Sequence, residues 1–149
     1  MKIAIGADHG GYSLKVDVIE HLKKKGYEVI DCGTDSTASV DYPIYGKKTA
    51  LKVKDGEADF GIVICGTGIG ISISANKVPG IRCALLSDVF SAKATRSHNN
   101  ANMMAMGARV IGPGLALEIV DAFLSTPFSG DERHQRRIDE MMAIEKECK

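Results

Sequence analysis

The chain of 149 residues has no tryptophan, and only 5% of its residues are aromatic. It also lacks an excess of charge of either sign, because 19 lysines and arginines balance 19 aspartates and glutamates. A balanced chain has no overall field that attracts nucleic acid or an anionic membrane. We therefore expect neither as a partner, and any anion must be bound by groups that are placed locally.

Long hydrophobic runs are absent as well. No stretch approaches the roughly 20 apolar residues of a membrane-spanning helix, and the first residues, MKIAIGADHGG, are too briefly apolar for a signal peptide. We expect a cytoplasmic protein. A hydrophobic content of 44% and a charged content of 26% are typical of globular proteins. We expect residues 1–149 to form a single domain.

Cysteine is scarce and dispersed. Cys32, Cys65, Cys83 and Cys148 include no CxxC pair, which argues against a zinc site or a redox motif, and we expect no metal. Cys32 and Cys83 lie in apolar runs, where a free cysteine is usually a small buried hydrophobe. Cys65 differs from the others through its neighbours.

The chain alternates β-rich runs with helical patterns. Continuous apolar runs are typical of parallel strands covered on both faces, and helical spacing separates them, as in Leu14, Val18 and Leu22. The sequence therefore predicts a Rossmann-like three-layer α/β/α sandwich with about five parallel strands and helices on both faces. The predicted strands are 2–8, 27–33, 60–65, 82–87 and a fifth within 101–112. A final helix is predicted over 131–147, with Ile138, Met141, Met142 and Ile144 on its apolar side.

Polar residues follow several of these strands, at the edge where open parallel sheets bind ligands. The segment ICGTGIGISISANK, residues 64–77, follows the third strand. As a dinucleotide fingerprint, G-x-G-x-x-G, it fails at the third glycine, where Ile71 or Ile73 stands. Asp88 lies about where a ribose-binding acid could be, so a nucleotide-binding module remains an alternative.

An anion-binding interpretation of this segment does not require the complete dinucleotide fingerprint. Small residues from Gly66 to Gly70 let backbone N–H groups approach a ligand, and the helix that follows adds its positive end. The same helix end favours the thiolate form of Cys65. A thiolate beside an oxyanion pocket suits proton abstraction next to a carbonyl. The alternative is a tight strand-to-helix turn with a packing cysteine.

Three other segments are candidates for chemistry. GADHGG places Asp8 beside His9, which could shuttle protons or bind phosphate, although Asp8 could simply cap a helix. His98 ends a helix that runs back from the fourth strand, so it points away from its own subunit's site unless a second subunit completes the geometry. Arg133 and Arg137, at i and i+4, could grip a phosphate or form a solvated face.

In order along the chain, these segments resemble the ribose-5-phosphate isomerase B family, within the wider group that includes galactose-6-phosphate isomerase subunits. The segments are GADHGG, VDYPIYG, ICGTGIGISISANK, GIRCAL, SHNNANMMAMGARVIG and RHQRRI. The resemblance implies interconversion of D-ribose 5-phosphate and D-ribulose 5-phosphate through a cis-enediolate, without a metal or an organic cofactor. The same chemistry on a six-carbon substrate, such as allose or galactose 6-phosphate, remains open.

The resemblance also implies roles for single residues. Cys65 would be the base that moves the proton between C2 and C1, Asp8 would handle hydroxyl protons, and His98 would promote ring opening. The anion hole would be formed by the amides of Gly66, Thr67, Gly68, Ile69 and Gly70, with Thr67 also a hydroxyl partner. The phosphate would be surrounded by His9, Arg109, Arg133 and Arg137, and the sugar hydroxyls would be contacted by Tyr42 and Asn99.

Members of this family are homodimers, sometimes paired into tetramers, and each site is shared between two chains. The resemblance therefore implies that His98 serves the neighbouring subunit. Some members replace the cysteine base with a glutamate elsewhere in the loop. Here Ile69, Gly70, Ile71 and Ser72 follow Gly68, so Cys65 is the only candidate base in the loop. Arg136 and His134 receive no role.

Overall fold

The structure, a computed structural model, describes residues 1–148. Its centre is a sheet of five parallel strands in the order β2-β1-β3-β5-β4. The strands are β1 (Lys2–Ala7), β2 (Glu28–Asp31), β3 (Phe60–Cys65), β4 (Cys83–Leu85) and β5 (Met103–Gly107). The helices are α1 (Tyr12–Lys24), α2 (Tyr42–Lys54), α3 (Ile69–Asn76), α4 (Val89–Asn99), α5 (Pro113–Ser125) and α6 (Glu132–Glu147).

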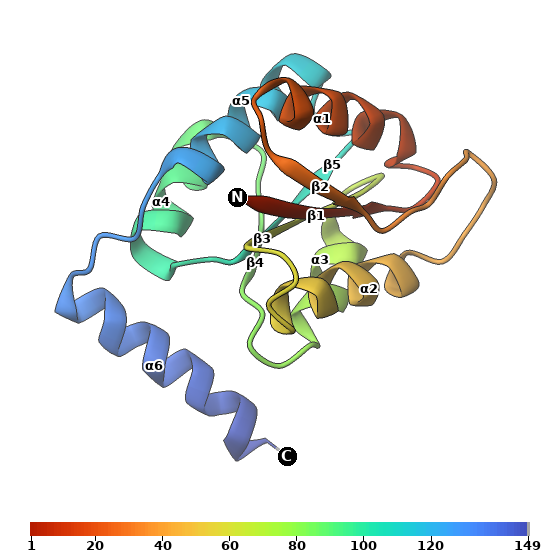
Figure 1. The fold of residues 1–149 in the computed structure, drawn as a ribbon. Helices are drawn as coiled ribbons and strands as arrows, with labels where there is room; N and C mark the ends of the chain where they lie inside the picture. The colour runs from red at the N-terminus through yellow and green to blue at the C-terminus, as the bar shows by residue number, and fades with distance from the viewer. Residues whose placement is uncertain (149) are drawn as a thin grey trace.

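Helices cover both faces of the sheet, as Figure 1 shows. Helices α1, α4 and α5 share one hydrophobic cluster with Ile62 and Ile64 of β3. Helices α2 and α3 share the other cluster with Val63 and Cys65 of the same strand. Successive residues of a strand face opposite sides, so both faces of β3 are buried, as its continuous apolar run predicts. The predicted three-layer parallel α/β fold is confirmed.

The helix α2 was not identified from sequence periodicity. Its buried residues are Gly46, Thr49 and Ala50, which are too small to make an aliphatic stripe. The predicted strands 27–33 and 82–87 are shorter in the structure, because β2 ends at Asp31 and β4 at Leu85. Their remaining predicted residues lie in turns and loops at the sheet edges.

Helix α6 stands apart from the sheet and lies beside the end of α4 (Figure 1). Its two buried residues are His134 and Ile138, whereas Met141 is 40% exposed and Ile144 is 55% exposed. The predicted apolar side of this helix is therefore only partly covered by its own chain. Among residues 1–148, no helix is both long enough and apolar enough to cross a membrane.

Candidate active site

The loops that follow β1 and β3 meet at the carboxyl edge of the sheet. The strand order places β2 and β3 on opposite sides of β1, and open α/β sheets bind ligands where the crossovers diverge in this way. The Asp8 N–H donates to the carbonyl oxygen of Ile64 at 3.2 Å. A Cβ built on Gly10 would lie 3.1 Å from the Gly66 nitrogen. The segments that begin at Asp8 and Cys65 are therefore direct neighbours.

Cys65 ends β3 and is 5% exposed. Its Sγ accepts a hydrogen bond from the Gly68 N–H at 3.1 Å. The Ile69 N–H donates to Thr67 Oγ1 at 3.2 Å. Helix α3 begins at Ile69, so the N–H groups of its first turn have no carbonyl one turn back in the helix. The sulfur thus lies beside a cradle of backbone amides, which suits an oxyanion.

The shape of this cradle requires glycine at two positions. Gly68 has φ 77°, and a Cβ there would lie 2.5 Å from Leu85 Cδ1. A Cβ on Gly107 would lie 2.6 Å from the backbone carbonyl carbon of Thr67. The cradle therefore packs backbone against backbone on the end of β5, with no room for a side chain between them.

Arg109 follows β5 and is held against the same loop. The backbone N–H of Arg109 donates to the carbonyl oxygen of Gly66 at 3.0 Å. The backbone N–H of Ala108 donates to the carbonyl oxygen of Cys65 at 2.9 Å. A Cβ on Gly66 would lie 2.9 Å from Arg109 Nη1, so the guanidinium covers this glycine. One cation, on an anchored backbone, therefore lies beside the amide cradle.

Asp8, His9 and Tyr42 border the cradle from neighbouring elements. Asp8 is 6% exposed, and its Oδ1 accepts from the Gly11 N–H at 3.1 Å. This bond forms a turn just before α1, whose N-cap residue is Gly11 and which has no side-chain cap. His9 Nδ1 accepts from the Val40 N–H at 3.2 Å. Tyr42 lays its ring on Gly70, where a Cβ would lie 2.5 Å from the ring Cζ.

His98 and Asn99 lie at the opposite edge of the sheet. They are the last two residues of α4. Three residues after Asn99, the carbonyl oxygen of Asn102, just before β5, accepts a hydrogen bond from the Gly61 N–H at the start of β3. Cys65 lies four residues further along β3 than Gly61, roughly 13 Å at about 3.3 Å per residue. One chain therefore does not bring His98 to Cys65.

His98 instead contacts the last helix. Its ring stacks on that of His134, with centroids 4.5 Å apart and planes 12° from parallel. Burial lowers the pKa of His134, and the cationic neighbours His98, Arg133 and Arg137 lower it further, against the carboxylate of Asp131. Both arginines are exposed on α6. His98, Arg133 and Arg137 therefore lie together around His134, away from the amide cradle.

Two arginines hold the end of α4 in place. Arg82 donates from Nε to the Asn99 carbonyl oxygen at 3.1 Å and from Nη2 to that of Asn100 at 2.8 Å. Arg96 Nη1 donates to the Ala101 carbonyl oxygen at 2.6 Å, and its guanidinium lies over the Phe60 ring. Burial lowers the pKa of both guanidinium groups.

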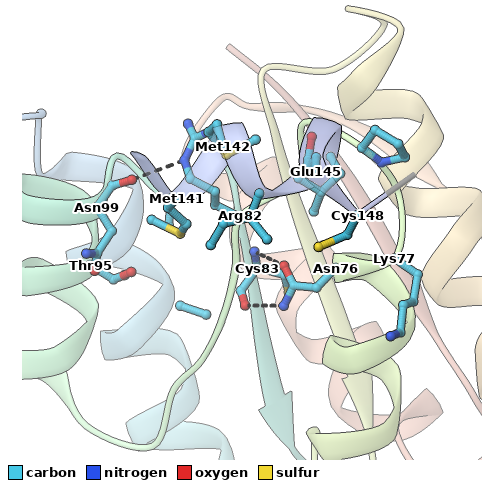
Figure 2. Close-up of a pocket in the computed structure, with 15 residues that line it drawn as sticks. Asn76, Lys77, Arg82, Cys83, Thr95, Asn99, Met141, Met142, Glu145 and Cys148 are labelled. Atoms are coloured by element: carbon cyan, nitrogen blue, oxygen red, sulfur yellow. Dashed lines mark hydrogen bonds between the residues drawn. The ribbon is translucent and has the colours of Figure 1, made fainter. Parts of the chain in front are cut away.

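A pocket of about 790 Å³ lies between α6 and this edge of the sheet, and Figure 2 shows the residues that line it. Asn99, Arg82 and Met142 line it, and Arg82 Nη1 donates to Met142 Sδ at 3.5 Å. Cys83 also lies here, and burial raises the pKa of its thiol to about 12. Cys65 does not border this cavity, so it is separate from the amide cradle.

The structure thus divides the predicted site residues into two groups. The carboxyl-edge group contains Asp8, His9, Tyr42, Gly66, Thr67, Gly68, Ile69, Gly70, Cys65 and Arg109. The amino-edge group contains His98, Asn99, Arg133 and Arg137. Sequence reasoning assigned nothing to Val40 or Arg82, because their roles depend on contacts that have no periodic signature.

The nucleotide-binding alternative loses support from this geometry. Asp88, the candidate ribose-binding acid, accepts the Ser91 N–H at 2.6 Å and caps α4. Within residues 1–148, no three His, Cys, Asp or Glu side chains are grouped as a metal site would need. The cradle and its borders bring together a thiol, a carboxylate, backbone amides and a guanidinium.

The fold and the loop define a doubly wound parallel α/β protein with a buried cysteine beside backbone amides at the switch point of the strand order. A family model described as Ribose/Galactose Isomerase matches residues 3–141. The chain belongs to this family.

Individual relatives agree with this assignment. Ribose-5-phosphate isomerase B of Escherichia coli is 51% identical over 144 residues, covering 97% of this chain and 96% of its own. Galactose-6-phosphate isomerase subunit LacB of Clostridium acetobutylicum is 46% identical over 149 residues, covering 98% and 86%. The structure of Clostridium thermocellum ribose-5-phosphate isomerase B superimposes with a TM-score of 0.98 and 56% identity, covering all of both chains.

Proposed function

We propose that this chain is an aldose–ketose isomerase that interconverts D-ribose 5-phosphate and D-ribulose 5-phosphate. The observation that carries the proposal is the Cys65 sulfur, hydrogen-bonded to the Gly68 amide at the start of an amide cradle. The membership of the ribose/galactose isomerase family supports the substrate class. Phosphorylated sugars are charged and do not cross membranes unaided, which supports a cytoplasmic location.

The proposed reaction moves one proton between neighbouring carbons. The Cys65 thiolate takes the proton from C2 of the open-chain aldose, and the electron pair forms the cis-enediolate. The negative oxygen lies in the amide cradle from Gly66 to Gly70, with Thr67 as a hydroxyl partner. Asp8 moves the proton between the hydroxyl oxygens, and the Cys65 thiol returns its proton to C1. The reaction is balanced without a cofactor.

We also propose that two copies of the chain form each complete site. In one chain, His98 and Cys65 lie at opposite edges of the sheet, so the ring-opening group and the base cannot meet. The exposed Met141 and Ile144 of α6 and the exposed Ile69 and Ile73 of α3 provide apolar surface for such contacts. Homodimers, or tetramers made of them, would place the amino-edge group of one protomer against the carboxyl-edge group of its partner.

In this arrangement the cations hold the phosphate and the polar side chains hold the sugar. His9 and Arg109 approach the phosphate from the chain that carries the base. Arg133 and Arg137 approach it from the other protomer, where guanidinium groups bind phosphate oxygens well. Tyr42 and Asn99 contact sugar hydroxyls from the two sides.

The decisive experiment replaces the proposed base. Cys65→Ala should abolish exchange of the C2 proton of ribose 5-phosphate with deuterated solvent, while phosphosugar binding persists. Cys83→Ala is the matched control, because Cys83 is also a buried free thiol but lies outside the cradle. It should keep its turnover. Near-full turnover in Cys65→Ala would show that another group is the base.

A six-carbon substrate is the second candidate, favoured by the similarity to a galactose-6-phosphate isomerase subunit. One additional carbon lengthens the substrate without changing the catalytic groups. Comparing kcat/KM for ribose 5-phosphate, allose 6-phosphate and galactose 6-phosphate separates the two. A larger value for either hexose phosphate would replace the first assignment.

A further inference from the structure

The loop 32–41, between β2 and α2, contributes one backbone group to the proposed site. The N–H of Val40 donates to Nδ1 of His9 at 3.2 Å. The side chain of Val40 has no polar group. Within residues 1–148, the Val40 amide is the only group of this loop that is hydrogen-bonded to His9. The direction of this bond determines which ring nitrogen faces the ligand.

The start of the loop is fixed by a buried lysine. Lys15 is 1% exposed, and its Nζ donates to Asp31 Oδ1 at 2.6 Å. The same carboxylate oxygen accepts the Gly33 N–H at 2.9 Å. A buried cation strongly disfavours losing its partner, so Asp31 stays in place and holds Gly33.

Two further bonds join the loop to β1. The Ala7 N–H donates to the Gly33 carbonyl oxygen at 2.7 Å, and the Thr34 N–H donates to the Ala7 carbonyl oxygen at 2.7 Å. Ala7 directly precedes Asp8. At its other end the loop runs into α2 at Tyr42, whose ring lies on Gly70. The loop that contains Val40 is therefore anchored at both of its ends, and these anchors place the Val40 N–H beside His9.

The chemistry of the bond is directional. A backbone N–H can only donate, so Nδ1 of His9 must offer its lone pair. A neutral imidazole then carries its proton on Nε2, whereas a proton on Nδ1 would set two N–H groups against each other. No acceptor for Nε2 is present among residues 1–148, which leaves its N–H free for a ligand.

We propose that the Val40 amide fixes His9 as the neutral Nε2–H tautomer, so that His9 presents one hydrogen-bond donor to a phosphate oxygen of the substrate. Val40 is a positioning residue in this role, because it acts through His9. The identity of the ligand rests on the proposed function, but the tautomer does not. His9 therefore binds phosphate as a directional donor, and the net positive charge around the phosphate comes from the arginines.

The test is a ¹⁵N NMR spectrum of the ligand-free protein labelled at histidine, with the His9 signals assigned by their loss in His9→Gln. The wild-type protein should show a pyridine-type Nδ1 and a pyrrole-type Nε2 near neutral pH. Val40→Pro removes the amide hydrogen and should shift both signals towards a mixture of tautomers. Val40→Ala keeps the hydrogen and should leave them unchanged.

Binding provides the second measurement. Val40→Pro should weaken binding of inorganic phosphate by about threefold to tenfold, the factor expected for one net hydrogen bond, whereas Val40→Ala should bind as the wild type does. A wild-type spectrum with a proton on Nδ1 overturns the proposal even if Val40→Pro fails to fold. If the wild-type spectrum is as expected but the protein does not isomerise ribose 5-phosphate, the tautomer assignment stands. The proposed function is then rejected.

Discussion

The guanidinium of Arg109 covers the α-carbon of Gly66, where a Cβ would lie 2.9 Å from Nη1. Gly66→Ala should move only the end of this flexible side chain. We expect the free energy of unfolding to change by less than about 1 kcal/mol, while KM for ribose 5-phosphate rises because the cation is displaced. Thermal unfolding and steady-state kinetics measure the two effects.

Gly68→Ala is the informative contrast, because the added Cβ would meet mostly backbone atoms, which cannot move aside as the end of a side chain can. Its Cβ would lie 2.7 Å from the Met106 carbonyl carbon, and φ is 77°. We expect it to lower the free energy of unfolding by about 2 to 4 kcal/mol. Equal stability losses in the two variants would contradict this account of the loop.

The proposal of a shared site predicts complementation between two defective chains. Cys65→Ala lacks the base and His98→Asn lacks the ring-opening group, so each variant alone should have low activity. After subunit exchange, mixed dimers contain one intact site, and random pairing gives about a quarter of wild-type activity. An activity equal to the sum of the separate variants would place both residues in the same chain's site.

The proposed phosphate contact of Arg137 on α6 can be tested against the neighbouring Arg136. Arg137→Ala should raise KM by about tenfold or more with little change in kcat, because it removes a charged hydrogen bond made in both ground and transition states. Arg136→Ala removes an adjacent arginine of the same helix that is also exposed and should change KM far less. If the two variants raise KM equally, α6 acts only through its general charge.

His134 makes stability depend on pH in a defined direction. Its pKa in the folded chain lies below the ordinary value of 6.5, so between the two values the unfolded chain binds more protons. Stability is therefore complete above about pH 6.5 and declines as the pH falls towards the folded-state pKa. Glutamine does not titrate, so the Tm of His134→Gln should fall by less than that of the wild type between about pH 7.5 and 5.5, at equal protein concentration. Parallel Tm profiles would assign the pH dependence to other groups.

The strands were predictable because burial on both faces gives continuous apolar runs, as in FGIVIC of β3. Helix α2 was not, since its buried side is made of small residues and leaves no hydrophobic period. The tightly packed turn after Cys65 was visible in the glycines, whose spacing indicates close backbone approach. The side chains that meet it, such as the Tyr42 ring on Gly70, depend on tertiary packing.

The division of the site into two edges was only partly predictable. That His98 runs back from β4 follows from the parallel topology, and the structure places it at the edge away from Cys65. Its stacking on His134 could not be predicted, because the direction that α6 takes after residue 131 is not encoded in its own periodicity. The Val40 contact was equally inaccessible, since every residue except proline has a backbone N–H.

The proposed placement of the base and the phosphate-binding arginines on different protomers has a consequence for selectivity. The distance from Cys65 to Arg137 across the shared site is set by how closely two subunits approach, and no single chain fixes it. The length of sugar that fits is then a property of quaternary packing. Substitutions at buried contacts between protomers, far from any sugar atom, should shift the preference between five- and six-carbon phosphates.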